Sequence, residues 1–308
     1  MPSPNTISVQ KLARLVGTPK CPVVVDVRDE EDFAADPRLL PGSVRRSFAE
    51  APEWAAGLRG RAAVVVCQKG LKLSEGTAAW LRHSGAPADV LEGGFAAWAA
   101  ALLPLVPVAK MPPRDALGRT VWVTRARPKV DRVACPWLVR RFIDPEAVFL
   151  FVAPAEVLAV AERFGAAPFD IEGTFWSHRG EACTFDTMVE EFALGTEPMS
   201  RLAAIVRGAD TARPELAPEA AGLLGVSLGL SRMFSDDLEQ VEAGMAVYDA
   251  LYRWCRDATD EKHNWPSATG KPAFGLSKKS RGKASASVTT PRCCSVSSTG
   301  ARTRIRPS

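Results

Sequence analysis

The sequence of 308 residues has no long hydrophobic run. Without a stretch of about 18 or more apolar residues, no transmembrane helix is expected, and we expect no membrane partner. The first residues, MPSPNTISVQ, lack a basic segment followed by an apolar core. We therefore expect no secretory signal, and a cytoplasmic location.

The cysteines do not form a pattern typical of disulfides or of zinc. The chain has seven of them, at positions 21, 67, 135, 183, 255, 293 and 294, and no CxxC motif. An odd number without a secretory signal argues against a disulfide framework and against a zinc ribbon. Reduced thiols are the better interpretation.

The net charge of +4 is unevenly distributed. Nine Lys and Arg and no acid lie in residues 271–308, so subtracting nine from +4 leaves residues 1–270 with a net charge of −5. An acidic body does not favour nucleic acid as a partner. Residues 267–308 have too few large apolar residues to fold and are predicted to be a disordered basic tail. A solvated arm and an out-of-frame gene end both remain open.

Short valine-rich runs predict buried parallel strands in the first hundred residues. They are PVVVDV at 22–27, RAAVVVC at 61–67 and ADVLEGG at 88–94. Between the last two, residues 74–85 read as a helix with Ser74 as N-cap and Gly85 just past its end. Another helix is predicted at 94–102. Alternating strands and helices predict an α/β fold with a parallel sheet flanked by helices.

Four prolines in residues 103–118 predict a linker, because proline donates no backbone hydrogen bond and stiffens the chain. We therefore predict one domain at 5–104, a proline-rich linker at 105–118 and a second domain at 119–260.

The second domain is predicted to be α+β and mostly helical. Strands are expected at 119–127 and 147–153, and a helix that begins or is interrupted near Pro136 lies between them. Further helices are expected at 154–165, 188–194, 199–210, 219–233 and 237–257.

Cys67 stands where a buried strand ends and a helix is about to begin. Loop amides and a helix N-terminus favour an anion there, and Lys69 and Lys72 add positive charge. Both effects favour the nucleophilic thiolate, and Gly70 lets the loop curl around an anion or a persulfide. The alternative is that Cys67 is simply a small buried residue.

The first hundred residues resemble the rhodanese, or sulfurtransferase, family. The resemblance covers about residues 6–103 and is carried by VVVDVRDEEDF, LLPGSVRRS, VVVC with its loop, and LEGGFAAW, in the family's order. It implies that Cys67 carries sulfur as the catalytic nucleophile, with thiosulfate or a persulfide as donor and no cofactor. It also implies a cradle around that sulfur, formed by Gln68, Lys69, Gly70, Leu71 and Lys72.

Asp26 and Arg28 match the family's Asp-x-Arg element at the end of the first strand. There a polar pair would brace the loop, although a plain surface ion pair is an alternative. One departure concerns the loop: active members often carry arginine near its end, followed by Ser or Thr. This chain has Lys72, Leu73 and then Ser74. Lysine lacks the planar fork that fits an oxyanion, so we expect thiosulfate to be a poor donor.

Basic residues cluster early in the second domain and are candidates for an oxyanion site. They are Arg125, Arg127, Arg132, Arg140 and Arg141. The alternative is a solvated surface.

His178, Cys183, Asp186 and Asp210 are candidate ligands for a metal ion of unknown identity, with a structural histidine as the alternative. Asp210 and Asp249 lie among apolar residues and, if buried, need a partner such as an arginine or a metal. Cys135 is either a redox thiol or, like Cys255, a core residue.

Residues 119–258 resemble the C-terminal domain of ChrB-type chromate-resistance proteins. The stretches that carry this are WVTRARPKVDRVACPWLVRRFIDPEAVFLFV, FDIEGTFWSHRGEACTFD, LAAIVRGAD and the run from 220 to 255. The family is associated with chromate-induced expression of an efflux operon. A rhodanese-like domain replaces its usual N-terminal region, which weakens the case for DNA binding.

Two functions follow as hypotheses. In the first, the protein is a sulfurtransferase-like enzyme associated with chromate resistance, with a small-molecule sulfur donor and acceptor, and a second domain that binds chromate, a similar oxyanion or a metal. In the second, it is a non-catalytic protein that senses chromate or a metal and regulates efflux. They differ in whether Cys67 takes up sulfur.

Overall fold

The computed structural model of the protein describes residues 5–261. The strands of the first part are β1 (Thr6–Ile7), β2 (Val23–Asp26), β3 (Arg38–Leu39), β4 (Val44–Arg45), β5 (Ala63–Val66), β6 (Ala88–Leu91) and β7 (Val106–Pro107). Its helices are α1 (Val9–Leu15), α2 (Glu30–Ala35), α3 (Ala51–Trp54), η1 (Ala55–Leu58), α4 (Lys72–His83), α5 (Gly94–Ala100) and η2 (Val108–Lys110).

The second part contains the strands β8 (Val121–Arg125), β9 (Val148–Val152) and β10 (Ala167–Pro168). Its helices are α6 (Asp131–Leu138), η3 (Val139–Ile143), η4 (Pro154–Glu156), α7 (Val157–Phe164), α8 (Thr184–Glu191), α9 (Glu197–Asp210), η5 (Pro214–Leu216), α10 (Ala220–Met233) and α11 (Asp237–Asp257). The predicted fold class, a parallel α/β sheet followed by a mostly helical α+β region, is confirmed over residues 5–261.

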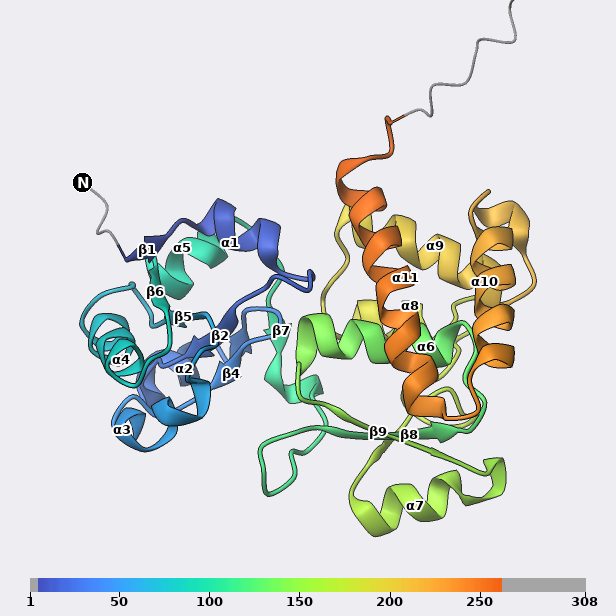
Figure 1. Ribbon diagram of the computed structural model, residues 1–308, viewed down its shortest axis with the longest axis horizontal. Helices are drawn as coiled ribbons and strands as arrows, with labels where there is room; N and C mark the ends of the chain where they lie inside the picture. The colour runs from blue at the N-terminus through green and yellow to red at the C-terminus, as the bar shows by residue number, and fades with distance from the viewer. Residues whose placement is uncertain (1–4, 262–308) are drawn as a thin grey trace, which may run out of the picture. The chain divides into compact units, whose positions relative to one another are not determined.

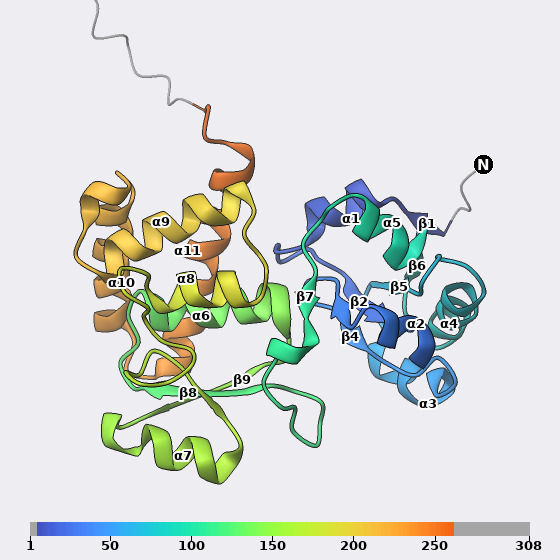
Figure 2. The same cartoon turned by 180° about the vertical axis from the view of Figure 1, so that it is seen from behind.

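The first part is built on a five-stranded sheet in the order β1-β6-β5-β2-β4, and all four strand pairs are parallel. Both faces of β5 are buried, which explains why its sequence is a run of valines rather than an alternation of apolar and polar residues. Helices therefore cover both faces (Figures 1 and 2).

Successive side chains of β5 point to opposite faces of this sheet. Val64 and Val66 pack into the core that includes α1 and α5, with Trp98 of α5 fully buried there. Val65 packs into the core on the other face, together with Leu81 of α4. Because the strand is fixed from both sides, the position where it ends is also fixed.

Helix α4 begins earlier than the sequence predicted. Its N-cap is Leu71, so the prediction of Ser74 as N-cap is wrong. The loop after β5 closes within a few residues, which places Ser74 inside the first turn with no exposed surface. The end of the helix was predicted correctly: Gly85 follows the C-cap Ser84 and has a φ of +87°, a conformation that glycine adopts without strain.

The proline-rich segment is not structureless. Val106 and Pro107 form strand β7, which pairs antiparallel with β3. The indole of Trp98 donates a hydrogen bond of 2.9 Å to the carbonyl of Pro104. These contacts hold the beginning of the segment that was predicted from the sequence to be a linker. The predicted domain boundaries themselves remain a prediction.

A three-stranded parallel sheet, in the order β10-β8-β9, forms one layer of the second part. Val123 of β8 packs with Val157 of α7 on one side of this sheet. Trp122 and Phe149 face the larger core, which also contains residues of α6, α8 and α9. Figure 1 shows β8 and β9 between α7 and the remaining helices.

Helix α6 is the central helix of the second part. Seven of its eight residues are buried, and it contacts α8, α9 and α11. Pro136 lies inside it, whereas the sequence predicted a helix that begins or breaks near this residue. The helix continues through the proline and then widens into the π-helical turn η3. The missing N–H of Pro136 removes one hydrogen bond inside α6.

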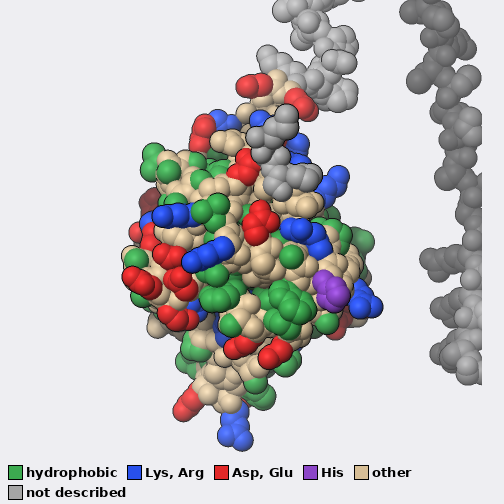
Figure 3. All heavy atoms as spheres, turned by 90° about the vertical axis from the view of Figure 1, so that its left-hand side faces the viewer, with side chains coloured by type: hydrophobic (Ala, Val, Ile, Leu, Met, Phe, Trp, Pro, Cys, Tyr) green, Lys and Arg blue, Asp and Glu red, His purple; other side chains and the backbone are tan. Residues whose placement is uncertain are grey.

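No helix between residues 5 and 261 is long and apolar enough to cross a membrane. On the face of the molecule shown in Figure 3, acidic and basic side chains are interspersed. The predicted disordered basic tail, 267–308, lies outside the described residues.

Replacing Trp137 by alanine should lower the free energy of unfolding by about 3–5 kcal/mol. This indole is fully buried in α6, stacks on Phe185 and donates a hydrogen bond to Asp249, so truncation leaves a cavity and removes one of the two hydrogen bonds to that carboxylate oxygen. Urea unfolding followed by far-UV circular dichroism measures the loss. The matched control is Trp80→Ala, because Trp80 is 45% exposed and should change stability by about 0.5 kcal/mol or less. Equal effects at both positions would contradict the assigned core.

Candidate functional site

The thiol of Cys67 lies directly after strand β5, in the loop that leads to helix α4. It is a free cysteine and only 5% of its surface is exposed. In a parallel α/β sheet the loops at the carboxyl ends of the strands form the usual binding edge. The position is therefore the one at which such a fold presents a reactive group.

The backbone of this loop is hydrogen-bonded to the start of helix α5. The N–H of Phe95 donates to the carbonyl of Cys67 at 2.9 Å, and the N–H of Ala96 donates to the carbonyl of Gln68 at 3.0 Å. The first two residues of the loop are thus held by main-chain contacts that do not depend on side-chain identity.

Two glycines allow this close approach. Gly70 has a φ of +66°, and a Cβ there would overlap the carbonyl oxygen of Leu91. Gly94 has a φ of +61°, and a Cβ there would overlap the carbonyl oxygen of Cys67. Only a residue without a side chain fits either position, because both the conformation and the space exclude a Cβ.

Two buried polar atoms near the thiol have no hydrogen-bond partner. They are Oε1 of Gln68, next to Cys67 in sequence, and Oγ of Ser74, in the first turn of α4. Buried polar atoms in native proteins usually have partners, so each of these calls for a ligand or a water molecule. Lys69 and Lys72 are exposed, and neither makes an ion pair with the residues that the structure describes.

Asp26 and Arg28 form a buried ion pair at the end of strand β2. Their side chains are 1% and 0% exposed, and a guanidinium nitrogen of Arg28 lies 2.7 Å from a carboxylate oxygen of Asp26. Arg28 also donates to the carbonyls of Asp36 and Arg38. Its guanidinium carbon lies 3.8 Å from the ring centroid of Phe95, the residue whose N–H holds Cys67. The pair is thus part of the support beneath the loop rather than a surface ion pair.

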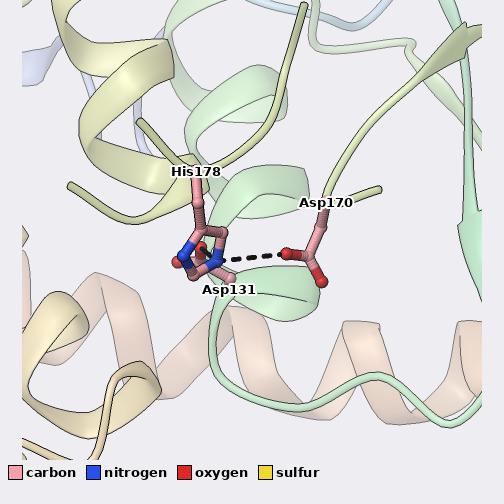
Figure 4. Close-up of side chains that lie close together, drawn as sticks. All are labelled: Asp131, Asp170 and His178. Carbon is pink, nitrogen blue, oxygen red and sulfur yellow. Dashed lines mark ion pairs between the residues drawn. The ribbon is translucent and has the colours of Figure 1, made fainter. Parts of the chain in front are cut away.

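A second group of side chains converges on His178. Its Nε2 atom lies 3.3 Å from a carboxylate oxygen of Asp210, 3.4 Å from one of Asp170 and 3.6 Å from one of Asp131. Figure 4 shows the Asp170 carboxylate pointing toward the imidazole ring. One ligand atom from each of Asp131, Asp170 and His178 lies within 4.8 Å of the others.

The carboxylate of Asp131 has no exposed surface and lies against the start of helix α8. One of its oxygens accepts hydrogen bonds from the N–H groups of Thr184, at 2.7 Å, and Phe185, at 3.4 Å. Burial and the neighbouring carboxylates of Asp210 and Asp170 raise the pKa of Asp131 well above its usual value. Burial and Asp170 raise the pKa of Asp210 in the same direction.

Two of the five candidate oxyanion-binding arginines lie at this cluster, and both are paired with Asp170. Arg125 contacts one of its oxygens at 2.8 Å, and Arg132 contacts the same oxygen at 3.2 Å. A pocket of about 330 Å³ opens beside them. It is lined by Arg125, Lys129, Val130, Arg132, Asp170, His178, Ala209, Asp210 and Leu224.

The other three arginines are engaged elsewhere. Arg127 donates to the carbonyl of Ser231, and Arg140 pairs with Glu242. Arg141 pairs with Asp249 at 2.8 Å, so Asp249 has the arginine partner that its apolar surroundings required. The described structure therefore does not bring the five arginines to one site.

Of the four residues that the sequence suggested as metal ligands, two lie in this cluster and two do not. His178 and Asp210 are in the cluster, whereas Asp186 pairs with Arg207 at 2.7 Å and accepts the N–H of Cys183. Cys183 is buried at the start of α8, and burial raises the pKa of its thiol. Cys135 is buried as well, and burial raises its pKa.

Sequence reasoning missed Asp131 and Asp170. Asp131 and Arg132 precede the apolar run VACPWL in α6, and an acid next to such a run could have indicated a buried role. Asp170 has a φ of +53°, an uncommon conformation that the sequence does not reveal.

Comparison with known families confirms both resemblances. Residues 8–101 match the model of the rhodanese-like domain, and residues 122–255 match the model described as ChrB, C-terminal domain. The chain thus combines a rhodanese-like domain with a ChrB C-terminal domain. Both matches lie inside the domain ranges predicted from the sequence.

A curated relative is Protein ChrB of Cupriavidus metallidurans, which is 35% identical over 147 residues. The match covers 47% of this chain and 43% of the relative, so the chain spans less than half the length of that protein.

Among solved structures, a rhodanese-related protein of Thermoplasma volcanium is 23% identical, with a TM-score of 0.29, over 33% of this chain and 97% of that one. A thiosulfate sulfurtransferase of Pseudomonas aeruginosa is 27% identical, with a TM-score of 0.29, over 34% of this chain and 20% of that one.

Replacing Gly94 by alanine should lower the free energy of unfolding by about 2 kcal/mol or more, because the new Cβ strains the backbone and pushes on the carbonyl of Cys67. Chemical denaturation measures the change. Gly76→Ala is the control: a Cβ at this helical position meets nothing within 4 Å, so stability should be unchanged or rise by up to about 1 kcal/mol. A Gly94 variant as stable as the Gly76 variant would disprove the tight packing of the loop.

Proposed function

We propose that this protein is a sulfurtransferase-like protein associated with chromate resistance. In this proposal Cys67 carries sulfane sulfur as a persulfide, and the ChrB C-terminal domain binds or responds to chromate or a metal ion. The observation that carries the proposal is the position of Cys67: a free thiol at the carboxyl end of β5, in a loop whose backbone is fixed by the glycine turn before α5.

The reaction at Cys67 would be a sulfur exchange. The thiolate attacks the outer sulfur of a donor such as thiosulfate, a new S–S bond forms, and the S–S bond of the donor breaks as sulfite leaves with the electron pair. An acceptor such as cyanide then takes the outer sulfur and returns the thiolate. The exposed, unpaired Lys69 and Lys72 offer positive charge to an anionic donor.

One unpartnered buried donor in the first turn of α4 supports anion binding beside this loop. The hydroxyl of Ser74 can donate a hydrogen bond to an anion or a persulfide, and it has no other partner. Helix α4 adds its N-terminal end, where no side chain of the N-cap residue satisfies the first N–H groups.

The link to chromate rests on the ChrB C-terminal domain. Chromate is a tetrahedral dianion, and persulfides are reducing, which gives a chemical reason for combining the two domains in one chain. Donor, acceptor and oxyanion are all part of the proposal.

A non-catalytic sensor is the second candidate. The observation in its favour is that Cys67 is only 5% exposed and that Lys72 and Leu73 stand where active members of the rhodanese family often have arginine followed by Ser or Thr. In that case the rhodanese-like domain would dock or sense without turnover.

The purified full chain should transfer sulfur from a persulfide or thiosulfate donor to cyanide. Its intact mass should rise by about 32 Da, the mass of one sulfur atom, after incubation with the donor. Cys67→Ser should abolish both the turnover and this mass increase. Cys21→Ser is the matched control, because burial raises the pKa of Cys21 to about 11 and its thiol should carry no sulfur. A folded protein that gains no adduct from several donors would rule out the carrier role and leave the sensor.

Lys72→Arg should raise the rate with thiosulfate by roughly three- to tenfold, because a guanidinium can bind two oxygens of the sulfonate at once. Steady-state rates with thiosulfate and with a neutral persulfide donor give the comparison. The gain should be confined to thiosulfate, since only that donor carries the oxyanion. Lys11→Arg, on the distant helix α1, should leave both rates unchanged.

A further inference from the structure

Three carboxylates surround the imidazole of His178, and ligand atoms of Asp131, Asp170 and His178 all lie within 4.8 Å of one another. Asp131 is the first residue of α6 and Asp210 is the last residue of α9. Asp170 follows β10, and His178 lies in the loop before α8. Asp131 and Asp210 therefore approach Nε2 of His178 through tertiary folding, whereas Asp170 belongs to the same loop region as His178.

Hydrogen bonding does not account for this arrangement. Nε2 of an imidazole carries at most one hydrogen and can donate to one oxygen at a time, whereas three carboxylates surround it. None of the three distances is as short as a charge-assisted hydrogen bond, which lies near 2.7–2.9 Å.

One oxygen of Asp131 accepts no hydrogen bond from an N–H or O–H group, and the carboxylate also interacts with the weakly donating thiol of Cys183. The Oδ1 atom of Asp131 is buried without such a hydrogen bond, while its Oδ2 atom accepts the N–H groups at the start of α8. Removing a carboxylate from water costs much free energy unless each oxygen is paired or bound to a cation. The oxygen that faces His178 is Oδ2, and its two N–H donors carry no full charge, so the buried carboxylate as a whole can still take a cation.

The nearby cations do not fill that role. Arg125 and Arg132 both contact the oxygen of Asp170 that is turned away from His178. Among the described residues, none of the ion pairs of Asp131 or Asp210 involves an arginine or a lysine. Two carboxylates thus share the neighbourhood of a single imidazole.

The spacing suits a metal ion. Ligands about 2.1 Å from a tetrahedral zinc ion are separated by about 3.4 Å, and the distances from Nε2 to the three carboxylates are 3.3, 3.4 and 3.6 Å. A moderate adjustment of the carboxylate rotamers would place one oxygen of each residue on a common ion.

Contacts behind the ligands hold them in place. Thr184 donates its hydroxyl to Asp170 at 3.1 Å and its N–H to Asp131 at 2.7 Å, so one residue orients two of the acids. Arg125 and Arg132 fix the far oxygen of Asp170. Such supporting hydrogen bonds are typical of preorganised metal sites.

We propose that Asp131, Asp170, His178 and Asp210 bind one divalent transition-metal cation of the Zn²⁺, Mn²⁺ or Fe²⁺ class. The imidazole disfavours Mg²⁺ and Ca²⁺, which prefer oxygen ligands alone, and the converging atoms include no thiolate that would select Cu⁺. The ion would enter through the pocket that His178 and Asp210 line.

This inference deepens the second half of the proposed function, since it names the metal ligands of the ChrB C-terminal domain. It does not depend on sulfur chemistry, so Cys67→Ser should bind the ion as tightly as the wild type. A protein that binds the metal but transfers no sulfur would contradict only the role of Cys67 as a sulfur carrier. A protein that transfers sulfur but binds no metal would contradict only the metal site.

The test uses the full chain, freed of metal with a chelator and titrated separately with Zn²⁺ and Mn²⁺ by isothermal titration calorimetry. We expect one ion per chain at this site and a rise in the melting temperature on binding. His178→Gln and Asp210→Asn, at the two most exposed ligands, should each weaken binding at least about tenfold. Asp210→Asn should also keep or raise the melting temperature of the metal-free protein, because it removes one of the like charges.

The matched control is Glu181→Gln, three residues from His178, whose side chain is 85% exposed and pairs with Arg213 outside the cluster. It should bind both ions as the wild type does. The proposal is overturned if the wild type binds neither ion, if His178→Gln and Asp210→Asn bind with unchanged affinity, or if Glu181→Gln loses binding to the same extent as they do.

Discussion

The carboxylate of Asp131 joins three helices of the ChrB C-terminal domain while having no access to water. Asp131 is the first residue of α6. Its carboxylate accepts hydrogen bonds from the first N–H groups of α8, and its backbone N–H donates to a carboxylate oxygen of Asp210 at the end of α9. A buried acid is unfavourable unless its surroundings compensate it, so the ends of these helices are arranged around its charge. The positions of His178 and Asp170 follow from the same arrangement, because Thr184 connects Asp170 to Asp131.

The two candidate sites have opposite electrostatic preferences. At Cys67, a helix start, two lysines and the unpartnered hydroxyl of Ser74 favour a negative group. At His178, three acids favour a positive one. The hypothesis of an oxyanion site formed by five arginines does not describe the second site well, since its two local arginines already contact Asp170 and the other three have other partners.

Local patterns were enough to predict the longer strands β2, β5, β6, β8 and β9 and most helices from α4 onward, because valine runs, glycines and apolar periodicity act within a few residues. The two-residue strands β1, β3, β4, β7 and β10 and the helices α1, α2 and α3 were not predicted. Strand β5 and the place of Cys67 after it belong to this group. Ser74 shows the limit: N-cap preference favoured it, but the short loop after β5 started the helix at Lys72. Asp186 was chosen as a ligand because it is near His178 in sequence, yet it caps α8 and pairs with Arg207. Asp131 reaches His178 only through folding over a long stretch of chain, and Asp170 reaches it through the turn that pairs Phe169 with Trp176, and no local pattern encodes either contact.

The hydrogen bonds from Phe95 and Ala96 to the Cys67 loop involve main-chain atoms alone. Side chains on the outer face of α5 can therefore drift during evolution without changing the shape of the loop. Substitution is restricted instead at Gly70 and Gly94, where any side chain would collide with a neighbouring backbone. In this loop the most informative positions for tracing descent are the ones that have no side chain.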